Sequence, residues 1–168
     1  MLTRIPRAIV AVQAFVMVNG DPHYAQFDVK RYRHWTLRVS DRQSYLGKAV
    51  VWLEREGDMQ RLSSLTKDEQ IELWDRVLPE YERALENLWK PDHMNYGWLG
   101  NLFALHKGHG HMHLIPRYAS SREFGGHVFV DTEWGKHYKV DSRENTPLPL
   151  VMAVRDVLRA EIPDALSV

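Results

Sequence analysis

Three histidines at alternate positions, His109, His111 and His113, are the residues of this sequence whose types and spacing best predict chemistry. In an extended chain, residues i, i+2 and i+4 project from the same face, so the three imidazoles would form one row. Successive members of such a row lie roughly 6–7 Å apart along the strand. That spacing suits side chains that flank a phosphoryl group or a metal ion.

Neutral imidazole is a competent nucleophile near pH 7, and a covalent intermediate divides one difficult displacement into two easier ones. A phosphoryl transition state carries charge on its equatorial oxygens, so fixed donors aimed at those oxygens are the main catalytic resource. Protonated His113 is one candidate donor. The candidate substrate-binding residues are Asn95, Asn101, His106, Lys107 and Arg117.

Two other interpretations of the row stay open. It could be a polar strand face exposed to solvent. It could also bind zinc for metal-assisted hydrolysis. Because i and i+4 on a strand lie ~13 Å apart, zinc would take two neighbouring histidines and a distant ligand such as His93 or Glu54.

The composition is that of a soluble globular protein. The 168 residues are 44% hydrophobic and 26% charged, with 22 basic and 22 acidic residues and no cysteine. Zero net charge and the lack of a basic stripe disfavour a nucleic-acid partner. The absence of cysteine excludes disulfides and thiol nucleophiles, and it fits a reducing compartment such as the cytoplasm.

An apolar run at residues 8–18 follows Arg4 and Arg7. It is too short to span a bilayer, so we expect no membrane partner. A signal peptide is the rival interpretation, but Gln13 interrupts the run and no small-x-small cleavage site follows it. A buried strand or short helix is therefore the favoured prediction.

Hydrophobic periodicity predicts strands and two main helices. A capping box of Thr66 and Glu69 starts the first helix, which runs to about Lys90 with a kink or a break near Leu78 caused by Pro79. The predicted strands are residues 35–39, 49–53, 93–99, 109–115 and 124–130, and the second helix is 148–160. This order predicts an α+β fold with an antiparallel sheet.

From His109 to Ile115 the sequence resembles the histidine triad (HIT) family, whose motif is His-φ-His-φ-His-φ-φ. The following Pro-Arg-Tyr is frequent there too. Further segments resemble the diadenosine-polyphosphate-hydrolase-like branch: Tyr45-Leu-Gly-Lys48, Leu65-Thr-x-x-Glu69, Tyr81-Glu-x-Ala84-Leu85, Pro91-Asp92, Met94-Asn95-Tyr96 and Leu99-Gly-Asn101. The resemblance covers roughly residues 31–118.

The resemblance implies a five-stranded antiparallel sheet with packed helices, usually in a homodimer, and hydrolysis of a small-molecule nucleotide. His111 would attack the α-phosphorus to give a nucleotidyl-histidine, with His109 and His113 flanking the phosphate. The third position of the motif is a histidine, His113, and in this the sequence resembles the hydrolase branches of the family. No cofactor is required, although magnesium could accompany a polyphosphate substrate.

The resemblance also divides the chain into an N-terminal segment (1–30), a HIT-like core (31–118) and an extension (119–168) packed on the same domain. Within the core the sequence departs from the family pattern. Gly100-Asn101 lies further from His109 than is usual, and Leu53-Glu-Arg-Glu56 stands where many members carry a histidine. A nucleotide-binding protein without catalysis is therefore the alternative function. Trp98 and Phe15 are the aromatic candidates for stacking on a base.

Overall fold

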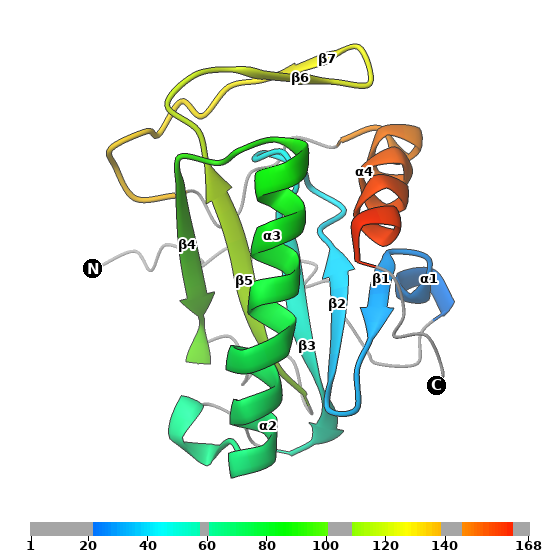
Figure 1. Cartoon of the computed structure of the whole chain (residues 1–168), viewed down its shortest axis with the longest axis vertical. Helices are drawn as coiled ribbons and strands as arrows, with labels where there is room; N and C mark the ends of the chain where they lie inside the picture. Colours follow the sequence, from blue (N-terminus) through cyan, green and yellow to red (C-terminus); the bar gives the residue numbers. More distant parts are fainter. Residues whose placement is uncertain (1–21, 58–60, 101–108, 139–145, 163–168) are drawn as a thin grey trace, which may run out of the picture.

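The structure, a computed structural model, describes residues 22–57, 61–100, 109–138 and 146–162. Its centre is an antiparallel sheet of five strands in the order β1-β2-β3-β5-β4 (Figure 1). The strands are β1 (Asp28–Arg31), β2 (Trp35–Val39), β3 (Ala49–Glu56), β4 (His93–Trp98) and β5 (His109–Arg117). The predicted α+β fold with a five-stranded antiparallel sheet is confirmed.

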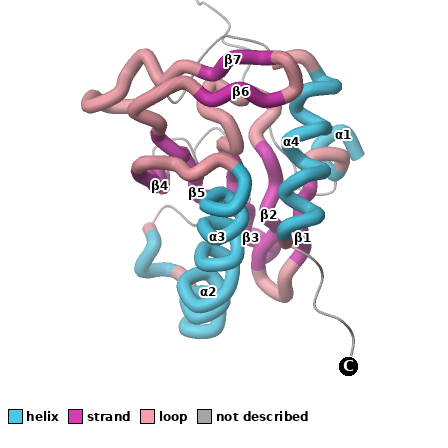
Figure 2. The backbone as a smooth tube through the Cα atoms, turned by 45° about the horizontal axis from the view of Figure 1, so that its top comes forward, coloured by secondary structure: helices cyan, strands magenta, loops and turns pink. Residues whose placement is uncertain are grey.

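The helices gather on one face of this sheet (Figures 1 and 2). They are α2 (Lys67–Glu72), a π-helical segment η2 (Leu73–Val77), α3 (Leu78–Leu88) and α4 (Leu148–Glu161). A short helix α1 (Pro22–Ala25) precedes the sheet, and a 3-10 turn η1 (Leu62–Ser64) precedes α2. The opposite face of the sheet is therefore left for the polar side chains of β5.

The hydrophobic core lies between the helices and the sheet. Met112 and Leu114 of β5 belong to it, together with Tyr81 and Leu85 of α3 and Leu158 of α4. Because side chains alternate along a strand, burial of these two β5 residues directs their neighbours His111 and His113 to the other face.

The first helix starts where the sequence predicts, and near Pro79 it continues through a π-helical segment instead of breaking. The Thr66 side chain accepts a hydrogen bond from the amide of Glu69 at 3.3 Å, and the Glu69 carboxylate accepts from the amide of Thr66 at 2.7 Å. Near Pro79 the helix widens, and the Leu78 amide donates to the carbonyl of Leu73 five residues earlier. The proline has no amide hydrogen for the regular ladder, and a π-helical segment takes up the interruption.

Residues 124–130, predicted as one strand, are instead part of a hairpin. The strands β6 (Arg122–Phe124) and β7 (His127–Phe129) pair with each other in a separate two-stranded sheet. Gly125 and Gly126 form the turn with φ of +60° and +73°. Positive φ at both central residues is what a two-residue hairpin turn requires, and glycine reaches it without a steric penalty.

Both ends of the described chain join the same core. Leu158 and Val154 of α4 pack in the cluster that contains Leu114, and β1 pairs with β2 in the main sheet. The boundary expected after residue 30 therefore falls inside β1. The apolar run 8–18 lies outside the described residues. No helix in the described part of the chain has the length and apolar character to cross a membrane.

Candidate active site

The three histidines form the predicted row on the face of β5 that turns away from the helices. β5 lies between β3 and β4, so His113 is paired with Val50 on one side and with Gly97 on the other. His109 and His111 are 7% and 8% exposed. The row is therefore largely closed to solvent in this conformation.

An indole supports two of the imidazoles. Trp52 lies opposite His111 on β3, and the two rings stack with centroids 5.2 Å apart and planes inclined by 12°. The same indole lies 5.5 Å from the ring of His109. The rings of His111 and His113 meet edge to face at 5.1 Å. Packing on a buried tryptophan thus limits how far the His111 ring can rotate.

A bulge in β3 gives His109 its partners. The register shifts after Trp52, so Glu56 is the residue opposite His109. Nδ1 of His109 lies 3.0 Å from the carbonyl oxygen of Leu53. A carbonyl can only accept, so Nδ1 carries the hydrogen and donates it. Nε2 of the same ring lies 3.8 Å from the carboxylate of Glu56.

His113 is neutral, which corrects the expectation that its protonated form donates to phosphate. Burial, with smaller effects from His111 and Lys48, lowers the pKa of His113 to about 3. Neither ring nitrogen has a hydrogen-bond partner among the described residues. The neutral ring still offers one N–H donor and one acceptor to a ligand.

Two cations share this side of the sheet with the row. Lys48 is 3% exposed, and its charge acts on His113. Arg38 of β2 lies over the Trp52 ring at 5.6 Å and forms an ion pair of 2.8 Å with Asp28. Cations beside the histidine row make this face suitable for an anion.

Of the candidate substrate-binding residues, Asn95 and Arg117 lie in the described part of the chain. Asn95 is on β4, paired with Ile115, on the same face as the row. Asn101, His106 and Lys107 fall at 101–108, outside the described residues. Substrate binding by any of these residues stays a prediction.

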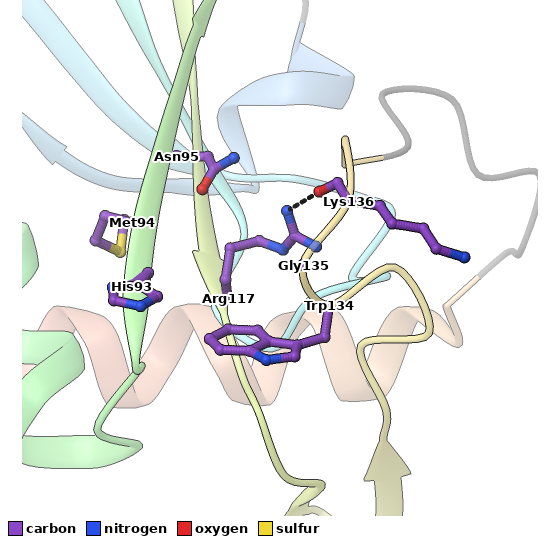
Figure 3. A pocket seen from close by; sticks show the side chains of 7 residues that line it. All are labelled: His93, Met94, Asn95, Arg117, Trp134, Gly135 and Lys136. Carbon is purple, nitrogen blue, oxygen red and sulfur yellow. Dashed lines mark hydrogen bonds between the residues drawn. The ribbon is translucent and has the colours of Figure 1, made fainter.

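Arg117 has a structural role that the sequence did not indicate. Its guanidinium is 4% exposed and donates to both carboxylate oxygens of Asp131 at 2.6 and 3.1 Å. It also donates to the carbonyl of Glu133 and to that of Lys136, the second of which is drawn in Figure 3. The ion pair with Asp131 raises the pKa of Arg117. These contacts attach the segment that follows β7 to the end of β5.

Sequence reasoning missed Trp52, Lys48 and the residues beyond β7. Positions 48, 50 and 52 alternate with the core residues 49, 51 and 53, but an almost wholly apolar run does not reveal which set faces the histidines. Trp98 packs edge to face with Trp35 at 6.5 Å, among side chains that lie against the core, so the suggestion that it stacks on a base is wrong. Phe15 lies outside the described residues.

The described residues contain no group of side chains that supports the zinc interpretation. Within 22–57, 61–100, 109–138 and 146–162, no three His, Cys, Asp or Glu side chains are grouped so that they could hold a metal. Of the distant ligands proposed, Glu54 accepts a hydrogen bond from Thr36, and His93 stacks on Trp134.

Comparison with known proteins gives likeness in structure alone. No protein-family model and no curated protein matches the sequence. A histidine triad protein from Bradyrhizobium japonicum is 21% identical, with a TM-score of 0.58 over 80% of this chain and 89% of that one. A hypothetical histidine triad nucleotide-binding protein from Sulfolobus tokodaii is 14% identical, with a TM-score of 0.58 over 81% and 83%.

A zinc-bound histidine triad family protein from Mycobacterium smegmatis is also similar, with 14% identity and a TM-score of 0.54 over 81% of this chain and 83% of that one. These likenesses show that the chain has the histidine triad fold. The triad of His109, His111 and His113 lies on that fold's central sheet, on β5.

Replacing Arg117 tests its structural role. Arg117→Ala leaves the buried carboxylate of Asp131 without its partner, so we expect the free energy of unfolding to fall by about 3 to 5 kcal/mol. Denaturant unfolding of the wild-type protein and of Arg117→Ala measures this difference in the free energy of unfolding. The double variant Arg117→Met/Asp131→Leu removes both charges and should lose much less. Equal losses in the single and double variants would contradict the buried pair.

The buried neutral state of His113 makes stability depend on pH. The unfolded chain protonates this histidine near pH 6.5 and the folded chain only near pH 3, so the unfolded state binds more protons between these values. Above pH 6.5 His113 makes its full contribution to the free energy of unfolding. Below pH 6.5 this contribution falls by about 1.4 kcal/mol per pH unit. His113→Gln should lack this part of the slope in unfolding measurements between pH 7 and pH 4.5, and parallel curves would contradict it.

Proposed function

We propose that this chain, which has the histidine triad fold, is a nucleotide hydrolase that cleaves a phosphoanhydride or phosphoramidate linkage of an adenosine-type nucleotide. The observation that carries the proposal is the row of three imidazoles on one face of β5, with Lys48 close enough to affect the pKa of His113. Imidazole nitrogens and a buried cation on one surface suit nucleophilic attack on an anionic phosphate.

His111 is the proposed nucleophile because it is the central residue of the row. An unprotonated ring nitrogen attacks the α-phosphorus, an N–P bond forms, and the bond from phosphorus to the leaving oxygen or nitrogen breaks. The leaving group departs with the electron pair and takes up a proton. Water then attacks the same phosphorus and releases the mononucleotide, which leaves His111 free again. Stacking on Trp52 orients the ring for both steps.

His109, His113 and Lys48 have supporting roles. The hydrogen bond from Nδ1 of His109 to Leu53 leaves Nε2 directed away from the backbone, where it can accept or relay a proton. His113 donates its N–H to an equatorial oxygen. The charge of Lys48 acts on the same oxygens in a water-poor site, where each charge is worth more than in bulk water.

Binding of a nucleotide without turnover is the second candidate function. The observation that favours it is Glu56, whose carboxylate, and not an imidazole, lies opposite His109. A carboxylate at this place does not supply the supporting imidazole, so chemistry can be lost while the nucleotide still binds. In this case AMP would bind, and the chain would turn over neither diadenosine tetraphosphate nor an adenosine phosphoramidate.

Replacing the nucleophile tests the proposal. We expect His111→Ala to reduce turnover of diadenosine tetraphosphate and of an adenosine phosphoramidate by about a thousandfold or more, because it removes the proposed nucleophile. Mass spectrometry of acid-quenched wild-type protein should detect one nucleotidyl adduct on the peptide that contains His111. Retained turnover by the variant would exclude the mechanism.

His127→Ala is the matched control, because this exposed histidine lies on β7, in a different sheet from the row. It should keep wild-type rates. Calorimetric binding of AMP to His111→Ala should persist, which separates loss of chemistry from loss of fold. Binding of AMP by wild-type protein without any turnover would favour the second candidate function.

A further inference from the structure

The segment that follows β7 returns to the main sheet and carries Tyr138. Its first part is attached to the end of β5, because Arg117 forms the ion pair with Asp131 and donates to the carbonyl of Lys136 (Figure 3). Between these two attachments, the indole of Trp134 stacks on the histidine that begins β4. The residues just before Tyr138 are therefore held against both β4 and β5.

The side chain of Tyr138 reaches β4 at the place where that strand pairs with the histidine row. Gly97 of β4 lies opposite His113 of β5, and residues directly opposite each other project from the same face of a sheet. A Cβ at position 97 would collide with the hydroxyl oxygen of Tyr138 and would lie 3.9 Å from the Cβ of His113. The hydroxyl therefore occupies the space of a side chain that β4 lacks, next to the third histidine.

The glycine at position 97 is explained by this close approach. Its φ does not lie in the left-handed region, so the backbone itself does not require glycine there. Inside a strand, glycine often marks a place where another group comes near. The group that comes near is the end of the Tyr138 side chain, which is half-buried. Gly97 thus admits a hydroxyl to the histidine face of the sheet.

The polar atoms around this hydroxyl lack partners. Neither ring nitrogen of His113 has a hydrogen-bond partner among the described residues, so Tyr138 lies beside this imidazole without bonding to it. On the same face, the indole nitrogen of Trp52 and one guanidinium nitrogen of Arg38 are also buried and unpartnered within the described part of the chain. Folded proteins pair the large majority of their buried polar side-chain atoms. Unpaired nitrogens gathered on one face therefore point to a polar ligand that bonds them.

We propose that Tyr138 is a substrate-binding residue of this site, whose hydroxyl donates a hydrogen bond to a non-bridging oxygen of the phosphate that His111 attacks. The inference rests on the proposed function, because it places that phosphate at the histidine row. A hydrogen bond to an ionised oxygen is roughly twice as strong as one between neutral groups. Tyr138 and the neutral ring of His113 donate to the phosphate from adjacent positions, and the segment after β7 contributes to the site.

Removing the hydroxyl is the direct test. Tyr138→Phe keeps the ring and should lower kcat/KM for diadenosine tetraphosphate by roughly 10- to 100-fold, the loss of one hydrogen bond to a charged group. Tyr96→Phe is the matched control, because Tyr96 also lies on β4 but pairs with Leu114 on the core side and donates to Glu82. It should keep wild-type kinetics. An unchanged kcat/KM in Tyr138→Phe would overturn the proposal.

A second variant displaces the same hydroxyl from the side of β4. Gly97→Ala adds a Cβ where the hydroxyl lies, and the end of the tyrosine side chain has to move away. We expect a loss of kcat/KM similar to that of Tyr138→Phe. The double variant should lose no more than either single variant, because both substitutions remove one and the same hydrogen bond. Losses that multiply in the double variant would contradict this coupling.

Ligand binding separates this inference from the proposed function. If wild-type protein turns over neither diadenosine tetraphosphate nor an adenosine phosphoramidate, the proposed function fails, and calorimetry with AMP and adenosine decides the role of Tyr138. Tyr138→Phe should weaken binding of AMP by roughly 10- to 100-fold and leave binding of adenosine unchanged, because only AMP carries the phosphate. Equal weakening of both ligands, which a purely structural role would cause, would overturn the proposal. Unchanged binding of AMP, or no binding of AMP to wild-type protein, would overturn it as well.

Discussion

The alternation of side chains along β5 is the constraint on which the rest of the structure depends. Leu114 and Met112 are 0% and 2% exposed in the core under the helices, and the pleat then leaves only the opposite face for the histidines. A slip of one residue in the pairing of β5 would bury the imidazoles among leucines and expose the core residues. The energy that fixes the register of the sheet is thus the same energy that holds the three imidazoles in one row.

The neighbouring strand adjusts the chemistry of the row. In a regular ladder Glu54 would lie opposite His109, but the bulge in β3 brings Glu56 there and leaves Glu54 to bond Thr36. Trp52, just before the bulge, keeps its place under His111. A bulge redirects side chains locally without breaking the sheet, and here it separates the support of His111 from the polar partners of His109.

Local sequence patterns predicted what depends on local structure. The alternation of residue types along β5 predicted the histidine row, and the pair Thr66 and Glu69 predicted the start of the helix. Both features depend only on residues that lie close together in the sequence. Contacts between distant segments could not be predicted: Trp52 under His111, Lys48 acting on His113, and Trp134 against His93 all depend on strand pairing or on a loop returning to the sheet. The depressed pKa of His113 follows from burial, which a single sequence does not encode directly.

The buried ion pair between Arg117 and Asp131 has a consequence for the geometry of the histidine face. It anchors the segment that carries Trp134 to the same strand as the row, four residues beyond His113, which corresponds to ~13 Å of extended chain. A rigid strand and a buried salt bridge do not stretch, so the fold holds the histidine row and the Trp134 segment at a fixed separation.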